Sequence, residues 1–114
     1  MLPKDKRLNL KKDFKRVASG RKIESKYLKL FLNEGDNTEP RIGIAISSKS
    51  FPKANMRNRA RRLISEAFQS LYSQLPTNTL IVALPKQGVI EVKSQEVVLD
   101  LEKVLSIINE KSSN

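Results

Sequence analysis

The feature that most constrains this chain is a helical pattern that begins in a cluster of arginines and continues into an apolar stripe. The stretch reads MRNRARRLISEAF over residues 56–68. At about 100° per residue, one side of such a helix is apolar, and its members are Met56, Ala60, Leu63, Ile64, Ala67, Phe68 and Leu71. Because this stripe must pack, the arginines are held at a fixed place beside the core.

The arginines of this helix stand where helix electrostatics disfavour them. They lie in its N-terminal half, whereas the helix dipole favours cations near the C-terminus. The four are Arg57, Arg59, Arg61 and Arg62. A phosphate-bearing partner across the helix start removes the conflict, because free amide groups and guanidinium groups both bind phosphate. The alternative is a solvated face in which Glu66 pairs with Arg62, but four arginines beside Asn58 favour the anionic partner.

The charge of the whole chain also indicates a polyanionic partner. Lys+Arg 22 and Asp+Glu 12 give a net charge of +10. Residues 1–62 hold 18 of the 22 basic residues and 6 of the 12 acidic ones, so the excess lies in the first half. This balance most often indicates nucleic acid. The absence of Cys and His excludes disulfides, thiolate nucleophiles, the common zinc sites and His-based catalysis.

At 114 residues the chain is expected to form a single domain. We expect residues 1–8 and 111–114 to be flexible. The chain has no apolar run of about 20 residues and no apolar segment behind its basic start, so we expect a cytoplasmic protein without a membrane partner. No pair of carboxylates has a spacing typical of acid–base or metal chemistry, and the four glycines are isolated. We therefore expect no catalytic residue and no metal ligand in this chain.

Hydrophobic periodicity predicts an α/β fold, in the form of an α+β two-layer sandwich. The element order is α-β-β-α-β-α, with three helices and a mixed sheet of about four strands. The pattern at 89–92 leaves open whether a short extra strand follows the third. The predicted helices cover 10–18, 56–74 and 94–108, and the predicted strands cover 26–32, 41–47 and 79–84.

The strand predicted at 26–32 alternates in a way that suits single-stranded nucleic acid. One face carries Tyr27, Lys29 and Phe31, which offers π-surfaces for bases and a cation for the backbone. The alternative is that aromatic residues fill strand positions because strands favour them. The other face is expected to enter the core and carries Leu28, Leu30 and Leu32.

Several segments together resemble the bacterial ribonuclease P protein component. The family's RNR signature stands here as Arg57-Asn58-Arg59 and is followed by a basic pair, Arg61-Arg62. The strand at 41–47, the helix at 13–17 with Gly20, and the strand at 80–84 before the helix at 94–108 follow in the family's order. The resemblance covers nearly the whole chain.

This resemblance implies the protein subunit of ribonuclease P, a ribonucleoprotein endonuclease that removes the 5′ leader from precursor tRNA. The RNA subunit holds the Mg²⁺-dependent active site, so no residue of this chain is catalytic. It also implies a left-handed β-α-β crossover around the arginine helix, against the usual right-handed rule. The residues implied to face the catalytic RNA are Arg57, Asn58, Arg59, Arg61, Arg62, Lys49 and Lys53. The residues implied to line a cleft for the leader are Phe14, Val17, Tyr27, Lys29 and Phe31.

Two other classes of function compete with this one. A structural RNA-binding protein, such as a small ribosomal protein, fits the composition and charge equally well. A DNA-binding helix-turn-helix protein is disfavoured, because the strands directly before the arginine helix leave no room for the motif's first helix. We therefore expect RNA partners and no DNA. We also expect Arg57→Ala with Arg59→Ala to weaken RNA binding and leave the fold intact, because neither side chain belongs to the apolar stripe.

Overall fold

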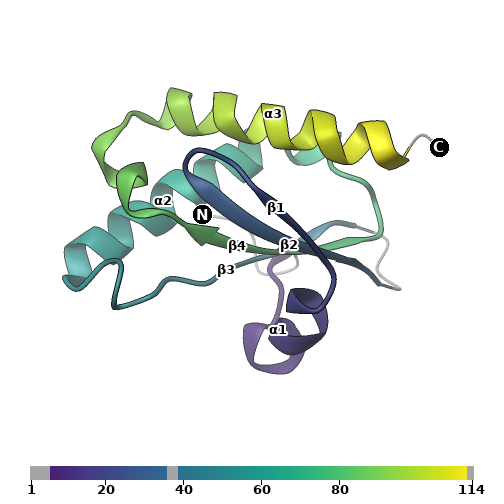
Figure 1. The fold of residues 1–114 in the computed structure, drawn as a ribbon, viewed down its shortest axis with the longest axis horizontal. Coiled ribbons are helices and arrows are strands. Elements are labelled where there is room, and N and C mark those ends of the chain that lie inside the picture. The colour runs from purple at the N-terminus through teal and green to yellow at the C-terminus, as the bar shows by residue number, and fades with distance from the viewer. Residues whose placement is uncertain (1–5, 36–38, 113–114) are drawn as a thin grey trace.

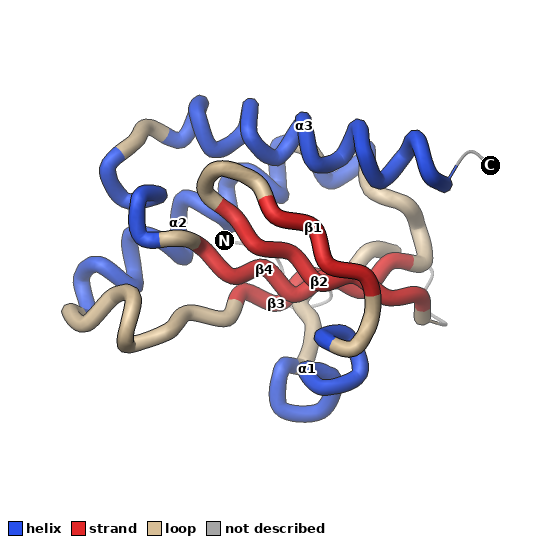
Figure 2. Tube along the Cα trace, in the orientation of Figure 1, coloured by secondary structure: helices blue, strands red, loops and turns tan. Residues whose placement is uncertain are grey.

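The computed structural model describes residues 6–35 and 39–112, which form three α-helices and a four-stranded sheet (Figure 1, Figure 2). The helices are α1 (Leu10–Ala18), α2 (Ala54–Ser70) and α3 (Ser94–Ser112). The strands are β1 (Arg21–Glu24), β2 (Leu28–Glu34), β3 (Arg41–Ile44) and β4 (Thr79–Pro85). Two 3-10 turns, η2 (Tyr72–Gln74) and η3 (Gln87–Glu91), follow α2 and β4.

The sheet is mixed, as predicted, with the order β1-β2-β4-β3. β2 pairs antiparallel with β1 and β4, whereas β3 pairs parallel with β4. β2 and β3 therefore run in opposite directions, as their short connection predicts, but β4 lies between them. The parallel pair joined by α2 is a β-α-β unit, and its left-handed sense stays a prediction from the family resemblance.

The predicted order lacks one strand that the structure contains. β1 has four residues, and only Ile23 among them is buried. So short a segment with a single apolar residue carries no readable alternation. The stretch at 89–92, where a strand was left open, instead falls mostly within η3 and buries Val89.

β4 is the central strand, and its two faces serve two separate clusters of side chains. Ile81 and Ala83 belong to the main core, which α2 and α3 cover. Leu80 and Val82 belong to a smaller cluster beneath α1. In Figure 1, α3 and α1 lie on opposite sides of the sheet. The expected core residues of β2 are in the main core, namely Leu28, Leu30 and Leu32. The opposite face of the sheet is therefore partly covered by α1 and is not part of the main core.

The start of the described chain is packed, which corrects the expectation that residues up to 8 are loose. Leu8 is buried, and its amide donates to the carbonyl of Ile42 at 3.0 Å. Leu10 lies above Gly43, where a side chain on β3 would meet it. The space that Gly43 leaves on the sheet is therefore filled by the chain itself. Residues 1–5 lie outside the described residues, as do 113 and 114, while 111 and 112 belong to α3.

α1 is fixed at both ends. At its start, the side chain of Asn9 accepts a hydrogen bond from the amide of Lys12 at 3.3 Å and so caps the helix. At its end, Gly20 approaches β2 so closely that a Cβ would lie 2.1 Å from the carbonyl oxygen of Leu32. The glycine φ is not positive, so close packing rather than a left-handed cap requires glycine here.

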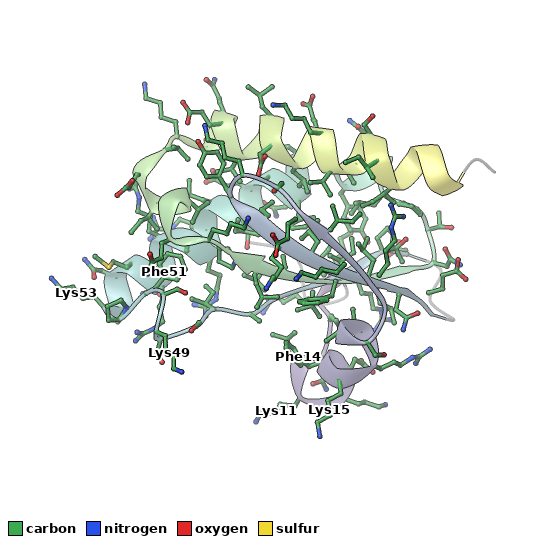
Figure 3. The ribbon with its side chains drawn as sticks, viewed as in Figure 1. Lys11, Phe14, Lys15, Lys49, Phe51 and Lys53 are labelled. Atoms are coloured by element: carbon green, nitrogen blue, oxygen red, sulfur yellow. The ribbon has the colours of Figure 1, made fainter. Side chains whose placement is uncertain are left out.

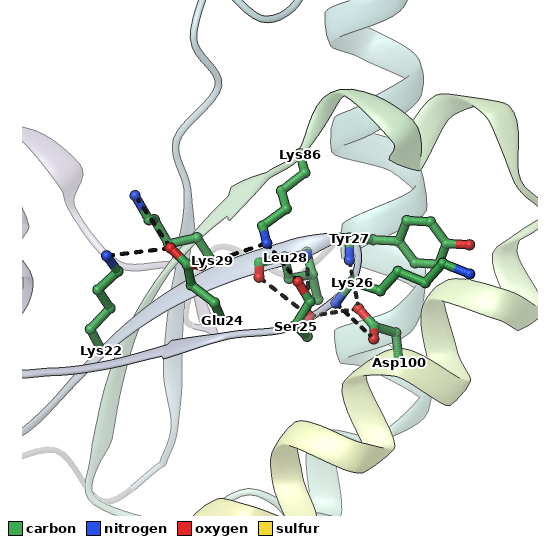
Figure 4. A network of polar contacts seen from close by, with 9 residues as sticks. All are labelled: Lys22, Glu24, Ser25, Lys26, Tyr27, Leu28, Lys29, Lys86 and Asp100. Atoms are coloured by element: carbon green, nitrogen blue, oxygen red, sulfur yellow. Dashed lines mark hydrogen bonds and ion pairs between the residues drawn. The ribbon is translucent and has the colours of Figure 1, made fainter.

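A buried carboxylate holds the turn between β1 and β2. Asp100 of α3 is 7% exposed and accepts hydrogen bonds from the Ser25 hydroxyl at 2.6 Å and the Tyr27 amide at 3.0 Å (Figure 4). The amide of Lys26 also donates to it, at 3.3 Å. The turn is thereby tied to a helix some 75 residues away in sequence.

Asp100→Ala is expected to lower the free energy of unfolding by about 2–3 kcal/mol, because it leaves the donors of the turn without an acceptor in a buried place. Urea denaturation measures this change. Glu102→Ala, an exposed acid on the same helix, is the control and should change stability by less than about 0.5 kcal/mol. Equal effects of the two variants would remove Asp100 from this role.

Candidate nucleic-acid interface

The arginines of α2 divide between its two edges, as the helical wheel predicts. Arg61 lines a small hollow with Arg7, Leu10 and Ile42 on the β3 side. Arg59 and Arg62 line a separate hollow with the chain before α3, and Lys93 lies there too. Ser65 of the same helix is 2% exposed and so faces the core rather than the arginine edges. The helix start has Lys53 as its cap residue, no side-chain cap and no acid in its first turn. The positive charge at the N-terminus of α2 is therefore not neutralised by any acidic or capping side chain of the first turn.

Two of these arginines also bind the backbone of neighbouring loops. Arg57 donates from Nη1 to the carbonyl oxygens of Phe51 at 2.9 Å and Pro52 at 3.0 Å. Arg59 donates from Nε to the carbonyl oxygen of Ile90 in η3 at 2.9 Å. They therefore anchor the loop before α2 and the turn after β4. The expectation that neither arginine supports the fold is wrong, because a wheel shows the stripe of a helix but not the loops that fold back on it.

Other predicted RNA-facing residues are exposed. Lys49, Lys53 and Arg62 have no ion pair or side-chain hydrogen bond within the described parts of the chain. Lys49 and Lys53 stand on the loop that leads into α2 (Figure 3). Asn58 is exposed and accepts from Arg61 at 3.4 Å. The Glu66–Arg62 pair offered as the alternative is not formed among the described ion pairs. Cations without internal partners can contact an external anion at little cost.

The sheet face on the α1 side is only partly covered and holds a groove of about 330 Å³. Lys29, Leu84 and Ala45 form a row across its floor, in register from β2 through β4. The loop that Arg57 anchors lines it with Ser47 and Ser50, and the segment after β4 adds Lys86 and Gln87. The arginine helix therefore fixes elements that border this groove.

Three of the five residues implied for the leader cleft lie on this face. Phe31 is half-buried in the cluster beneath α1, next to Lys29 on the same face of β2. Phe14 is 37% exposed, and Figure 3 shows it on the sheet side of α1, while Lys11 and Lys15 project away. Aromatic surface and cations thus occur together on the face that α1 only partly covers.

The other two implied residues do not line a surface cleft. Val17 is fully buried, so it packs α1 on the sheet and cannot reach a ligand. Tyr27 precedes β2 in the turn after β1, where its amide binds Asp100 and its ring packs on the main core (Figure 4). The alternation that placed Tyr27 beside Phe31 ends at Leu28, because Ser25 and Leu28 close a turn there.

The groove contains an acid that the sequence pattern did not single out as a binding residue. Glu24 of β1 stands opposite Lys29 and lies between three lysines (Figure 4). Its carboxylate is 3.3 Å from Nζ of Lys22, 3.7 Å from Nζ of Lys29 and 3.8 Å from Nζ of Lys86. Lys22 and Lys86 were also missed, since one belongs to the unpredicted strand β1 and the other is brought in by β4.

The lysines hold the pKa of Glu24 below its ordinary value. The main cause is the hydrogen bond and charge of Lys22, followed by the charges of Lys86 and Lys29. Lys22→Ala should therefore raise the pKa of Glu24, which an NMR titration of its side-chain carbon measures. Because the folded-state pKa is the lower one, the ion pairs are present at neutral pH and are lost as the pH falls through that value. An unchanged pKa in the variant would contradict this origin.

No helix in the described part of the chain is long and apolar enough to cross a membrane. Within the same residues, no three acidic, His or Cys side chains group as metal ligands do. The acid of the groove is surrounded by ammonium groups, which disfavour a divalent cation. The acid of the groove, with its lysine neighbours, is therefore a poor ligand for Mg²⁺.

Comparisons with known proteins agree with the sequence resemblance. The family model described as Ribonuclease P matches residues 2–109. A ribonuclease P protein component from Pseudanabaena sp. is 35% identical over 108 residues, covering 93% of both chains. One from Psychrobacter sp. is 33% identical over 109 residues, covering 91% of this chain and 84% of its own. The solved RNase P protein from Thermotoga maritima superposes with a TM-score of 0.78 at 27% identity, covering 87% of this chain and 94% of that one. The chain therefore belongs to the ribonuclease P protein family.

Proposed function

We propose that this chain binds the RNA subunit of ribonuclease P through the start of α2 and holds the single-stranded 5′ leader of precursor tRNA in the groove beside α1. Family membership supplies the RNA partner. The observation that carries the assignment of the two surfaces is their difference in chemistry. Cations without an ion pair in the described parts of the chain gather around α2, whereas exposed aromatic surface and lysines lie on the open face of the sheet.

The chemistry of each surface suits a different part of an RNA. Lys49, Lys53 and Arg62 have no internal partner among the described residues, which suits the phosphates of a folded RNA by counterion release. Phe14 and Phe31 offer ring faces on which unpaired bases stack, and Lys29 lies beside them. A base-paired RNA has no free base faces to offer, so the groove is better matched to a single strand.

Phe31→Leu tests the sheet face that holds the groove, because Phe31 lies on the same face of β2 as Lys29. The variant keeps an apolar side chain against the cluster beneath α1 but removes the stacking surface. The ratio of its affinity for a precursor tRNA to its affinity for a tRNA without a leader should therefore fall by about fivefold or more. The affinities are measured with the reconstituted protein–RNA complex. Tyr27→Leu is the matched control, because Tyr27 lies on the far side of the turn and should leave the preference for the leader unchanged.

Equal losses for both substrates in Phe31→Leu would remove this residue from the leader site. A loss of leader preference in Tyr27→Leu but not in Phe31→Leu would contradict the placement of the groove itself. The Mg²⁺ that the family resemblance implies belongs, in this proposal, to the RNA subunit, which also performs the cleavage.

A further inference from the structure

Glu24 is the acidic side chain that lines the groove, and three lysine ammonium groups lie within 4 Å of it. They come from three segments: Lys22 from β1, Lys29 from β2 and Lys86 from the segment directly after β4. Lys86 has a second tether, since its Nζ donates to the carbonyl oxygen of Ser25 at 2.7 Å. One carboxylate thus collects three cations, of which Lys29 and Lys86 line the groove.

We propose that Glu24 is an internal competitor of the RNA backbone, occupying the place in which a phosphate of a bound single strand would contact Lys22, Lys29 and Lys86. This inference rests on the proposed function, because it concerns the same groove. Glu24 thereby lowers the affinity of the groove for any single strand, and the preference for a leader then depends more on stacking than on charge.

The geometry supports exchange of one anion for another. A carboxylate and a phosphate both accept charge-assisted hydrogen bonds from ammonium groups. The carboxylate is 47% exposed and the three lysines are 37% to 50% exposed, so all four side chains can move without opening the core. Exposed ion pairs of this kind are individually weak. An incoming phosphate can therefore displace Glu24, but breaking the ion pairs of Glu24 costs free energy that would not be needed in a groove without this residue.

A purely structural role would be to protect the edge of the sheet. β1 is an edge strand, and charged residues on such strands discourage pairing with other chains. Glu24 is exposed and has no hydrogen bond to the backbone in the described part of the chain, so its neutralisation should leave the fold unchanged. The two roles differ in what they predict for RNA affinity, since edge protection alone predicts no change.

The test uses Glu24→Gln in the complex reconstituted with a ribonuclease P RNA. The control is Glu102→Gln, which changes the net charge equally but on α3, on the opposite side of the sheet. Affinities for a precursor tRNA and for a leaderless tRNA are measured over a series of salt concentrations. Melting curves of the two variant proteins check that both remain folded.

We expect Glu24→Gln to bind the precursor about three- to tenfold more tightly than Glu102→Gln, the scale of a few exposed ion pairs. The salt dependence should steepen by about 0.7 in the slope of log K against log salt for each additional phosphate contacted. Affinity for the leaderless tRNA should match that of the control. Equal or weaker binding of the precursor by Glu24→Gln would overturn the inference, and weaker binding would show that the carboxylate instead orders the lysines.

Failure of this inference is distinguishable from failure of the proposed function. If Phe31→Leu reduces leader preference and Glu24→Gln changes nothing, the groove binds the leader but Glu24 does not compete with it. If neither variant changes leader preference, the groove is not the leader site and both proposals fail.

Discussion

Gly20→Ala should lower the free energy of unfolding by about 2–3 kcal/mol, the largest effect we expect from a single added methyl group in this chain. The new Cβ would lie 2.1 Å from the carbonyl oxygen of Leu32, and backbone in a central position of β2 cannot move aside cheaply. The end of α1 would have to lift from the sheet. Urea denaturation measures the loss.

Gly88→Ala is the matched control for this substitution. The nearest atoms to a Cβ at Gly88 are those of the Tyr27 ring at 4.0 Å, which is ordinary contact, and its φ is not positive. Its stability should stay unchanged or rise slightly, because alanine restricts the unfolded chain more than glycine does. Similar losses in both variants would show that close packing at Gly20 is not the cause.

Arg57→Ala with Arg59→Ala should weaken binding of the RNA subunit on the order of a hundredfold, if each arginine contributes about 1–1.5 kcal/mol. The structure adds a second effect that the helical pattern alone does not predict. Both side chains hold backbone carbonyls of neighbouring loops. The double variant should therefore also melt about 5 °C or more below the unsubstituted protein.

Arg62→Ala separates the two effects. Arg62 belongs to the same helix but has no hydrogen bond or ion pair among the described residues. It should lose RNA affinity at an unchanged melting temperature. If the double variant keeps its melting temperature, the carbonyl contacts do not support the loops. If it keeps its RNA affinity, the start of α2 is not the RNA-binding surface.

The sequence predicted the helices, the central strand and the mixed sheet because each depends on a regular spacing of apolar residues. The alternation of Leu28, Leu30 and Leu32 and the stripe of α2 both appear in the core. β1 was missed because four residues with one buried side chain give no periodic signal. The pairing of β2 with β4 was missed because it joins segments far apart in sequence, which no local pattern encodes.

In the candidate site, too, features encoded in a local pattern could be predicted, whereas features that depend on strand pairing could not. The cations around α2 were predicted from charge and spacing, whereas Phe14 was implied by the family resemblance alone. The placement of Val17 in the cleft was wrong because this residue lies on the inner face of its helix and is buried. The placement of Tyr27 there was wrong because β2 begins one residue later, at Leu28. Lys22, Glu24 and Lys86 come together only through the order of the strands. Their cluster could not be predicted until β1 and β4 were known to flank β2.

The most direct test of the account is cleavage of a precursor tRNA at low Mg²⁺ by a bacterial ribonuclease P RNA, with and without this protein. The protein should restore cleavage at the mature 5′ end, and no cleavage should occur without the RNA subunit. Absence of stimulation, together with salt-dependent binding to many unrelated RNAs, would contradict it and would indicate a general structural RNA-binding protein.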